Sequence, residues 1–225
     1  MIPLRDVIPS RTTPGVTISI IAINVAVYLF GLLLLSARGR DSFILAFGLV
    51  PAYFTLVNVL TSMFVHGGLA HLIGNMLFLW IFGDNIEDRL GHGRFVVFYL
   101  ACGIAAALAQ VALNPGSLVP MVGASGAIAG VMGAYLVLYP HSRILMLFPF
   151  PVFLFELPAV VFLGIWFVVQ FLNGINQLPA FERDAISGGV AFWAHVSGFV
   201  TGVLLVLLMK RPERARVEWW DTIES

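Results

Sequence analysis

The sequence predicts an all-α protein, a polytopic membrane bundle of six transmembrane helices with an interfacial segment between the first two. Three properties predict this class. Of the 225 residues 60% are hydrophobic and only 11% are charged, the mean hydropathy is +0.96, and apolar runs near the length of a membrane span recur along the chain. The net charge of zero implies no bulk attraction to nucleic acid, and the lipid bilayer is the expected environment.

Six spans can be drawn from the apolar runs. Their expected bounds are residues 16–35, 70–82, 95–113, 125–139, 151–172 and 190–209. The first run is longer than the apolar core of a signal peptide and further spans follow it, so we expect a retained helix. The chain then divides into an N-terminal cytoplasmic segment at 1–15, one membrane domain at 16–209 and a cytoplasmic tail at 210–225.

The second and fourth spans are short. Residues 125–139 cover only about 22 Å, whereas the hydrocarbon layer is roughly 30 Å thick. One end of the fourth span should therefore lie below the membrane surface. Irregular backbone at that depth is tolerated only where protein buries it or where it lines a wet cavity. This predicts a cavity at Ser125, where the fourth span begins.

Lysine and arginine predict the orientation. With the N-terminus inside, the inner segments carry nine of these residues, and the outer segments carry Arg38, Arg40 and Arg183. This positive-inside bias places both termini in the cytoplasm, and we expect a multi-pass protein of a prokaryotic inner membrane. Spans two, four and six then begin at the outer face. The broken apolar segment 36–69 is expected to lie as amphipathic structure in the outer interface.

A serine framed by glycines, Gly123-Ala124-Ser125-Gly126, opens the fourth span. As a nucleophile, Ser125 would gain close backbone approach, and the N–H groups of Gly123 and Ser125 could hold an oxyanion. As a packing motif, Gly126 and Gly130 would let another membrane helix come near. Taken alone, this stretch favours the packing interpretation.

His195 is the candidate base. Gly198 and Gly202 give the sixth span a small-residue face that can press against the glycines of the fourth, which would bring His195 and Ser125 to a similar depth. An ionisable group inside the membrane is costly and usually functional. A neutral imidazole that accepts the serine proton would make the hydroxyl a nucleophile. The structural alternative is a histidine that only makes a hydrogen bond between helices.

His71 and Asn75 are spaced i, i+4 at the start of the second span, so both side chains lie on one helix face. Both can donate hydrogen bonds and would suit an oxyanion formed at Ser125. The structural alternative is an inter-helix hydrogen bond. His66 and His71 have the wrong spacing for a shared helix face and no carboxylate lies nearby, so neither a metal site nor a cofactor is expected.

With these residues in place, the chain resembles a rhomboid intramembrane serine protease. Three family motifs stand in order: His-x-x-x-Asn at 71–75, Gly-x-Ser-Gly at 123–126 and Gly-x-x-x-x-Ala-His-x-x-Gly-x-x-x-Gly at 189–202. The resemblance extends over roughly residues 16–209. It implies that Ser125 is the nucleophile and His195 the general base of a dyad. It also implies an oxyanion held by His71, Asn75 and the N–H of Ser125.

The resemblance implies further roles. His66 would be a structural hydrogen-bonding residue, Glu87 with Arg89 would cap the cytoplasmic turn, and the substrates would be membrane proteins cut in or near a transmembrane helix. This sequence departs from the family pattern at three places. A Trp-Arg pair is absent at 57–60, Ala129 stands where some members have a tyrosine packed on the histidine, and Ser197 replaces a frequent glycine.

Three functions can be considered for a chain with these residues. The leading one is peptide-bond hydrolysis through an acyl-enzyme on Ser125. The second is a non-catalytic membrane-protein binder or quality-control factor with the same fold. A small transporter fits poorly, because it predicts duplicated halves or acidic residues at mid-membrane, and the spans contain neither.

Overall fold

The computed structural model describes residues 2–177 and 191–210. Its helices are α1 Gly15–Leu34, α2 Ala37–Phe47, α3 Leu56–Thr61, α4 Leu69–Leu90, α5 His92–Leu113, α6 Ser125–Leu138, α7 Ala159–Gln177 and α8 Phe192–Met209. Short 3-10 turns flank α3, η1 at Pro51–Tyr53 and η2 at Ser62–Phe64. Three strands complete the described part, β1 Ile2–Asp6, β2 Arg143–Pro149 and β3 Val152–Pro158. Arg183, Gly189 and the tail after Lys210 lie outside the described residues.

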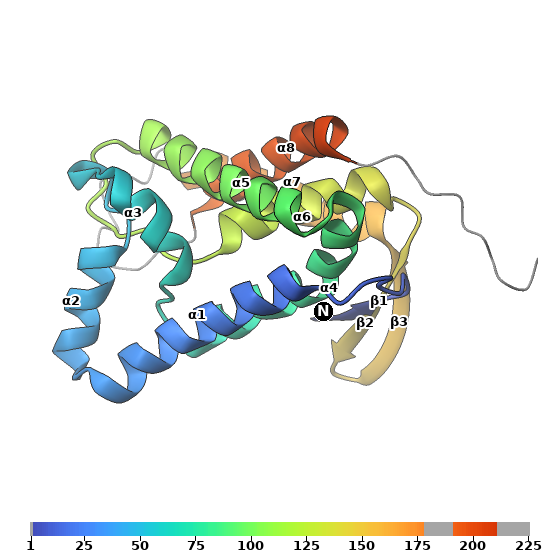
Figure 1. Ribbon diagram of the computed structural model, residues 1–225, viewed down its shortest axis with the longest axis horizontal. Coiled ribbons are helices and arrows are strands. Elements are labelled where there is room, and N and C mark those ends of the chain that lie inside the picture. The colour runs from blue at the N-terminus through green and yellow to red at the C-terminus, as the bar shows by residue number, and fades with distance from the viewer. Residues whose placement is uncertain (1, 178–190, 211–225) are drawn as a thin grey trace, which may run out of the picture.

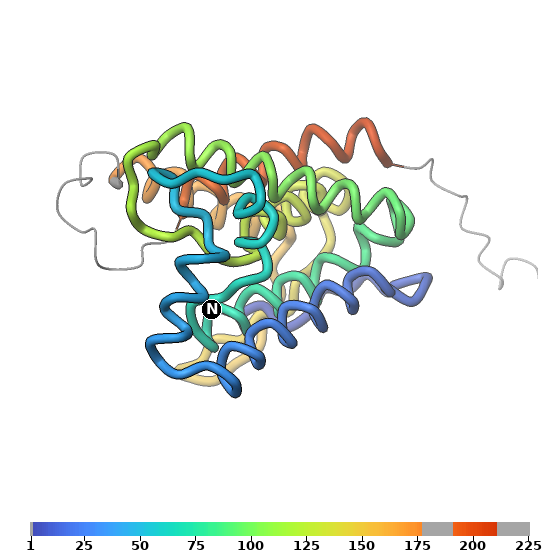
Figure 2. Tube along the Cα trace, turned by 60° about the vertical axis from the view of Figure 1, so that its left-hand side comes forward, coloured from blue at the N-terminus to red at the C-terminus, as the bar shows by residue number. Residues whose placement is uncertain are grey.

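The predicted helical membrane bundle is confirmed (Figures 1 and 2). Within the described residues, α1, α4, α5, α7 and α8 are long and apolar enough to cross a membrane, and the 14-residue α6 is a shorter apolar helix. The prediction that the second span is short is wrong, because α4 has 22 residues. The helix continues beyond Phe82 through Asn85 and Glu87, two polar residues that are 1% and 0% exposed. Protein contacts rather than lipid surround this end of α4.

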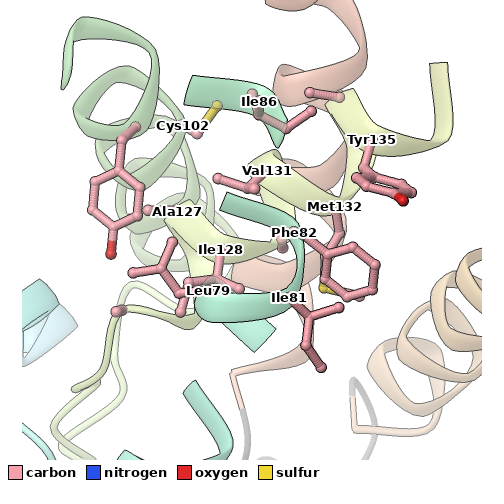
Figure 3. Close-up of a cluster of buried hydrophobic side chains, with 14 of the residues drawn as sticks. Leu79, Ile81, Phe82, Ile86, Cys102, Ala127, Ile128, Val131, Met132 and Tyr135 are labelled. Carbon is pink, nitrogen blue, oxygen red and sulfur yellow. The ribbon is translucent and has the colours of Figure 1, made fainter. Parts of the chain in front are cut away.

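The core centres on α6, in which ten residues from Gly126 to Tyr135 are buried. Figure 3 shows Leu79 and Phe82 of α4 beside Ile128 and Met132 of α6. The free thiol of Cys102 is fully buried in the same cluster, as expected for a packing residue. At 1.5 Å per residue α6 spans only about 21 Å. The short fourth span is therefore enclosed by its neighbours, as the sequence predicts.

Glycines let α6 and α8 approach until their backbones touch. A Cβ placed on Gly198 would lie 2.1 Å from the carbonyl oxygen of Gly126, and one on Gly202 would lie 1.9 Å from that of Gly130. Real Cβ atoms do not come this close to backbone, so only glycine is compatible with this distance between the helices. The predicted contact of two small-residue faces is confirmed, and it holds the first turns of α6 and α8 together.

The segment between the first two spans consists mainly of short helices that connect to the rest of the bundle through loop contacts. Leu49 exchanges backbone hydrogen bonds with Met121, just ahead of Ser125. Asn58 donates from its side-chain amide to the carbonyl oxygen of Gly48, and the hydroxyl of Thr61 donates to that of Phe47. The Leu49–Met121 pair thus ties the segment to the loop before Ser125, and the bonds of Asn58 and Thr61 hold the segment together internally, in a chain that lacks the Trp-Arg pair.

The three-stranded sheet was not anticipated. β2 pairs antiparallel with both β1 and β3, and the sheet lies at the opposite end of the bundle from α2 and α3 (Figure 1). The expected start of the fifth span at Pro151 is wrong, because residues 152–158 form β3 and α7 begins at Ala159. A short apolar run can belong to a strand or to a helix, and hydrophobic periodicity alone does not distinguish them.

Acidic residues in the last turns of α4 hold the start of α1. The buried carboxylate of Glu87 accepts hydrogen bonds from the backbone N–H groups of Val16 and Thr17, at 2.9 and 2.7 Å. Asp88 accepts from the backbone N–H of Thr12 at 3.1 Å. A carboxylate at a helix N-terminus satisfies unpaired N–H groups and opposes the positive end of the helix dipole. Glu87 thus caps α1, a more specific contact than the turn cap that the resemblance implies.

Candidate active site

Ser125 and His195 meet at the ends of two helices. Ser125 is the first residue of α6, and His195 lies in the first turn of α8. The two helix starts are brought together by the glycine contact, so His195 Nε2 lies 2.7 Å from Ser125 Oγ. This is hydrogen-bonding distance, and it allows an imidazole to take a proton from a hydroxyl directly.

The other side of the imidazole is held by α7. His195 Nδ1 lies 2.8 Å from Gln170 Oε1, and the ring of Trp166 packs against the imidazole with a centroid distance of 5.7 Å and an interplanar angle of 35°. Neither residue was predicted from the sequence. Trp166 and Gln170 are spaced i, i+4, which puts them on one helix face, and a glutamine within an otherwise apolar run was a usable signal. They supply contacts to the imidazole that the methyl group of Ala129 cannot make.

His71 and Asn75 approach the same site from the first turns of α4. A Cβ built on Gly123 would lie 2.7 Å from the His71 ring and 3.4 Å from the Asn75 amide nitrogen. This amide nitrogen is buried and has no hydrogen-bond partner among the described residues. Both side chains therefore border the loop that leads into Ser125, and Asn75 has a donor available for a group that enters there.

Gly123 contributes a backbone conformation to the site rather than a hydrogen-bond donor. Its φ of +114° lies in the region that favours glycine, and any side chain would collide with His71. Its N–H donates to the carbonyl oxygen of Ser62 at 2.9 Å, so the expectation that Gly123 supplies an oxyanion donor is corrected. The N–H groups of the first turn of α6, beginning at Ser125, have no acceptor within the helix.

His66 lies beside the site without touching Ser125. His66 is 5% exposed, and its ring stands edge-on to that of His71 at a centroid distance of 5.1 Å. Burial, and then the neighbouring His71, lowers the pKa of His66 to about 4. Neither ring nitrogen has a hydrogen-bond partner among the described residues. The hydrogen bond implied for His66 is therefore not made within this part of the chain, and the ring acts here through packing.

A small cavity adjoins Ser125. It offers about 20 Å³ to the centre of a water molecule, which is enough to hold one. Small side chains form most of its wall, including Gly103, Ala106, Ala127 and Ala194, and Met63 closes another side. The sequence-predicted cavity at the start of the fourth span is thus present. Residues 2–177 and 191–210 contain no group of three or more histidine, cysteine or acidic side chains placed to hold a metal ion.

Comparison with known proteins identifies several relatives. Rhomboid protease GluP of Bacillus subtilis (strain 168) is 42% identical over 86 residues, which cover 38% of this chain and 16% of that protein. Rhomboid protein 1, mitochondrial, of Saccharomyces cerevisiae is 33% identical over 158 residues, covering 66% of this chain and 40% of that protein. Rhomboid-like protein 11, chloroplastic, of Arabidopsis thaliana is 31% identical over 207 residues, covering 88% of this chain and 67% of that protein.

The candidate site lies within the part of the chain that resembles known proteins. The chain spans less than half the length of the first two of these relatives. The Rhomboid domain family model matches residues 53–212, a stretch that contains Ser125, His195, His71 and Asn75. The chain belongs to the rhomboid family.

Proposed function

We propose that this chain is an intramembrane serine endopeptidase with a Ser125–His195 dyad. The observation that carries the proposal is the 2.7 Å contact between His195 Nε2 and Ser125 Oγ at the enclosed start of a helix too short to cross the membrane alone. A serine and an imidazole at this distance are the minimum for nucleophilic acyl transfer. GluP, one of the relatives, is named a rhomboid protease.

The reaction follows from the two atoms in contact. Ser125 Oγ attacks the scissile carbonyl carbon while His195 Nε2 takes the hydroxyl proton. The tetrahedral intermediate then collapses, the C–N bond breaks, and His195 returns the proton to the leaving amine. A water molecule that His195 activates in the same way hydrolyses the acyl-enzyme and regenerates Ser125.

In this proposal three groups donate hydrogen bonds to the developing oxyanion. These are the N–H of Ser125, the amide of Asn75 and the ring of His71. Asn75 supports this role because its amide nitrogen is buried with no partner within the described residues, a state that costs free energy unless a ligand supplies the acceptor. Removal of one oxyanion donor typically lowers kcat about 10²–10³-fold.

The substrate class follows from the position of the site. An apolar bundle encloses the dyad at the depth where α6 begins, so a peptide bond that reaches it belongs to a transmembrane segment that has partly unwound. The cavity beside Ser125 is walled by glycine and alanine and has about 20 Å³ open to a water centre. It suits a small side chain next to the cleaved bond.

The membrane arrangement is part of the proposal. We place both termini in the cytoplasm and the dyad toward the outer face, from the distribution of lysine and arginine. The chain is a multi-pass membrane protein by its apolar helices. The named relatives belong to a bacterium, mitochondria and a chloroplast, and a prokaryotic inner membrane remains the prediction from sequence.

Replacement of Ser125 tests the nucleophile. The purified full chain is assayed on a fluorogenic transmembrane substrate and labelled with a fluorophosphonate, beside Ser125→Ala and Ser197→Ala. Ser197 is a control because its hydroxyl donates to the carbonyl oxygen of Trp193 in its own helix. We expect Ser125→Ala to lose labelling and at least about 10³-fold in kcat, with Ser197→Ala within about twofold of wild type.

Two results would contradict this assignment. Turnover by Ser125→Ala equal to wild type would show that another group is the nucleophile. A folded wild type that neither labels nor cleaves any of several transmembrane substrates would instead support a non-catalytic rhomboid-like binder.

A further inference from the structure

Gln170 contacts the side of His195 that the dyad does not use. The first eleven residues of α7, the helix that carries it, are apolar, and the indole of Trp166 is the only hydrogen-bonding side chain among them. Gln170 follows directly after these eleven residues. Its Oε1 lies 2.8 Å from His195 Nδ1, while Nε2 of the same ring lies 2.7 Å from Ser125 Oγ. One imidazole therefore bridges α7 and α6 through its two nitrogens.

The hydrogen bond between His195 Nδ1 and Gln170 Oε1 determines whether His195 Nε2, which faces Ser125, carries a proton. A glutamine carbonyl oxygen can only accept, so the contact requires the proton on Nδ1. The lone pair of the neutral ring is then on Nε2, where it faces Ser125. The opposite tautomer would place an N–H against the serine oxygen and could not remove its proton. The bond that a second group makes to one imidazole nitrogen selects the role of the other.

Trp166 restricts the ring from the same helix. It lies one turn before Gln170, packs on the imidazole at 5.7 Å, and packs in turn on Phe199 at 6.1 Å. A side chain held on one face and at one nitrogen has little freedom to rotate away from Ser125. A neutral amide also avoids the free-energy cost of a carboxylate at this depth in an apolar bundle.

We propose that Gln170 is the positioning residue of the proposed dyad, holding His195 in the tautomer and orientation that accept the proton of Ser125. The inference rests on the proposed function. The alternative is a glutamine that only joins α7 to α8. The two roles predict different rates for folded protein. A hydrogen bond that only links α7 to α8 affects stability, whereas one that positions His195 affects kcat.

Three variants of the full chain test the role. Gln170→Met keeps the length of the side chain and removes the acceptor. Gln170→Glu keeps an acceptor oxygen and adds negative charge. Gln110→Met is the matched control, since Gln110 is another partly buried glutamine of a membrane helix and its Oε1 has no partner among the described residues. Each is purified in detergent, its folded fraction is measured by size exclusion, and rates are expressed per folded molecule.

We expect Gln170→Met to lower kcat on the fluorogenic transmembrane substrate about 10- to 100-fold, with KM within about twofold, and to slow fluorophosphonate labelling in parallel. Gln170→Glu should recover most of the kcat. The acid limb of its pH–rate profile should move to higher pH by about one unit, because the carboxylate stabilises the imidazolium. Among the described residues, His71 is the other titratable side chain that acts on His195, and it is unchanged in all three variants.

A kcat for Gln170→Met within twofold of that for Gln110→Met would overturn the positioning role. If Gln170→Met does not fold, the folded Gln170→Glu variant provides the test. A pH–rate profile of Gln170→Glu identical to that of the wild type would also overturn the positioning role. Ser125→Ala is run beside them. Loss of labelling in Ser125→Ala together with a wild-type kcat in Gln170→Met would reject Gln170 alone, whereas labelling of Ser125→Ala would reject the proposed function itself.

Discussion

Two polar side chains of this apolar chain, His195 and Glu87, take hydrogen-bond partners from other elements. His195 of α8 reaches Gln170 of α7 and Ser125 of α6, and Glu87 of α4 caps the start of α1. Each bond satisfies a group that would otherwise be unpaired in a medium without water, where such groups cost several kcal/mol. The residues proposed for chemistry are therefore also residues that align helices.

Asp6 illustrates the same principle at the edge of the bundle. It lies at the end of β1 and accepts a hydrogen bond from the hydroxyl of Tyr135 at 2.6 Å, and that hydroxyl also contacts Ser142 Oγ at 2.9 Å. Burial raises the pKa of Asp6 from 3.8 to about 6. The proton on this carboxyl group is therefore retained at a pH where an exposed aspartate has lost it.

The shifted pKa predicts a pH-dependent effect of Asp6→Asn on stability. Between about pH 4 and 6 the folded chain binds the proton more tightly than the unfolded chain. The stability that Asp6 contributes is thus present at low pH and lost as the pH rises through 6. We expect Asp6→Asn to raise the thermal midpoint by a few degrees at pH 7.5 and by less near pH 4. Thermal unfolding in detergent across this range measures the difference.

Asp41→Asn is the control for this measurement, because Asp41 is an exposed acid of α2. A stability difference between Asp6→Asn and wild type that is the same at every pH would argue against a raised pKa.

At the scale of elements, the close approach of α6 to α8 positions the dyad. Neither helix start could reach the other if side chains separated the two backbones at Gly126–Gly198 and Gly130–Gly202. Small residues at such contacts allow van der Waals packing along the whole helix face, which is a main source of stability between membrane helices. The same glycines thus serve packing and place Ser125 beside His195.

Gly202→Ala tests this contact. Its Cβ would lie 1.9 Å from the carbonyl oxygen of Gly130, which is backbone and cannot rotate away. We expect the helices to separate, the thermal midpoint to fall by at least about 5 °C, and kcat to fall with it. Circular dichroism during heating and the substrate assay measure the two effects.

Gly164→Ala is the matched substitution, because no atom lies within 4 Å of a Cβ at that position of α7. It should leave the midpoint unchanged or slightly higher, since alanine favours helix over glycine. Equal midpoints for the two variants would show that the α6–α8 contact tolerates a side chain.

At the scale of the whole molecule, the two ends of the bundle differ in structure. One end carries α2, α3 and the loop into Ser125, and the other carries the sheet and the acidic turns of α4 (Figure 1). The 22-residue α5 joins them and extends about 33 Å, enough to cross the hydrocarbon layer. The dyad lies toward the end with α2 and α3, which the positive-inside rule assigns to the outer face.

Cysteine labelling tests this orientation. In a Cys102→Ala background, Gly93→Cys and Gly116→Cys form a matched pair, because a Cβ at either glycine meets no atom within 4 Å. Gly93 stands at the start of α5 and Gly116 just after its end. We expect a membrane-impermeant maleimide applied to intact cells to label Gly116→Cys, and Gly93→Cys only after permeabilisation. The reverse pattern would place the dyad on the cytoplasmic side.

Local sequence was sufficient for the features that short motifs encode. The glycine-framed Ser125, His195 ahead of Gly198, and the His71–Asn75 pair were all identified from spacing, and the structure brings them together. The strands were missed because apolar runs near Pro151 suit a strand or a helix equally, and pairing partners far along the chain decide between them. The last turns of α4 were not predicted, because polar residues such as Asn85 and Glu87 are typical of loops and only the fold shows that they are buried.

The sequence by itself determined that this chain is a membrane bundle with a truncated fourth helix and a candidate serine–histidine pair, because length, hydropathy and glycine spacing are local properties. Only the tertiary structure decided which face of α7 meets His195, which N–H of the Gly123 loop is already bonded, and which helix Glu87 caps. Those outcomes depend on the rotation and depth of one helix against another. They are set by the packing of the whole bundle and by no single stretch of sequence.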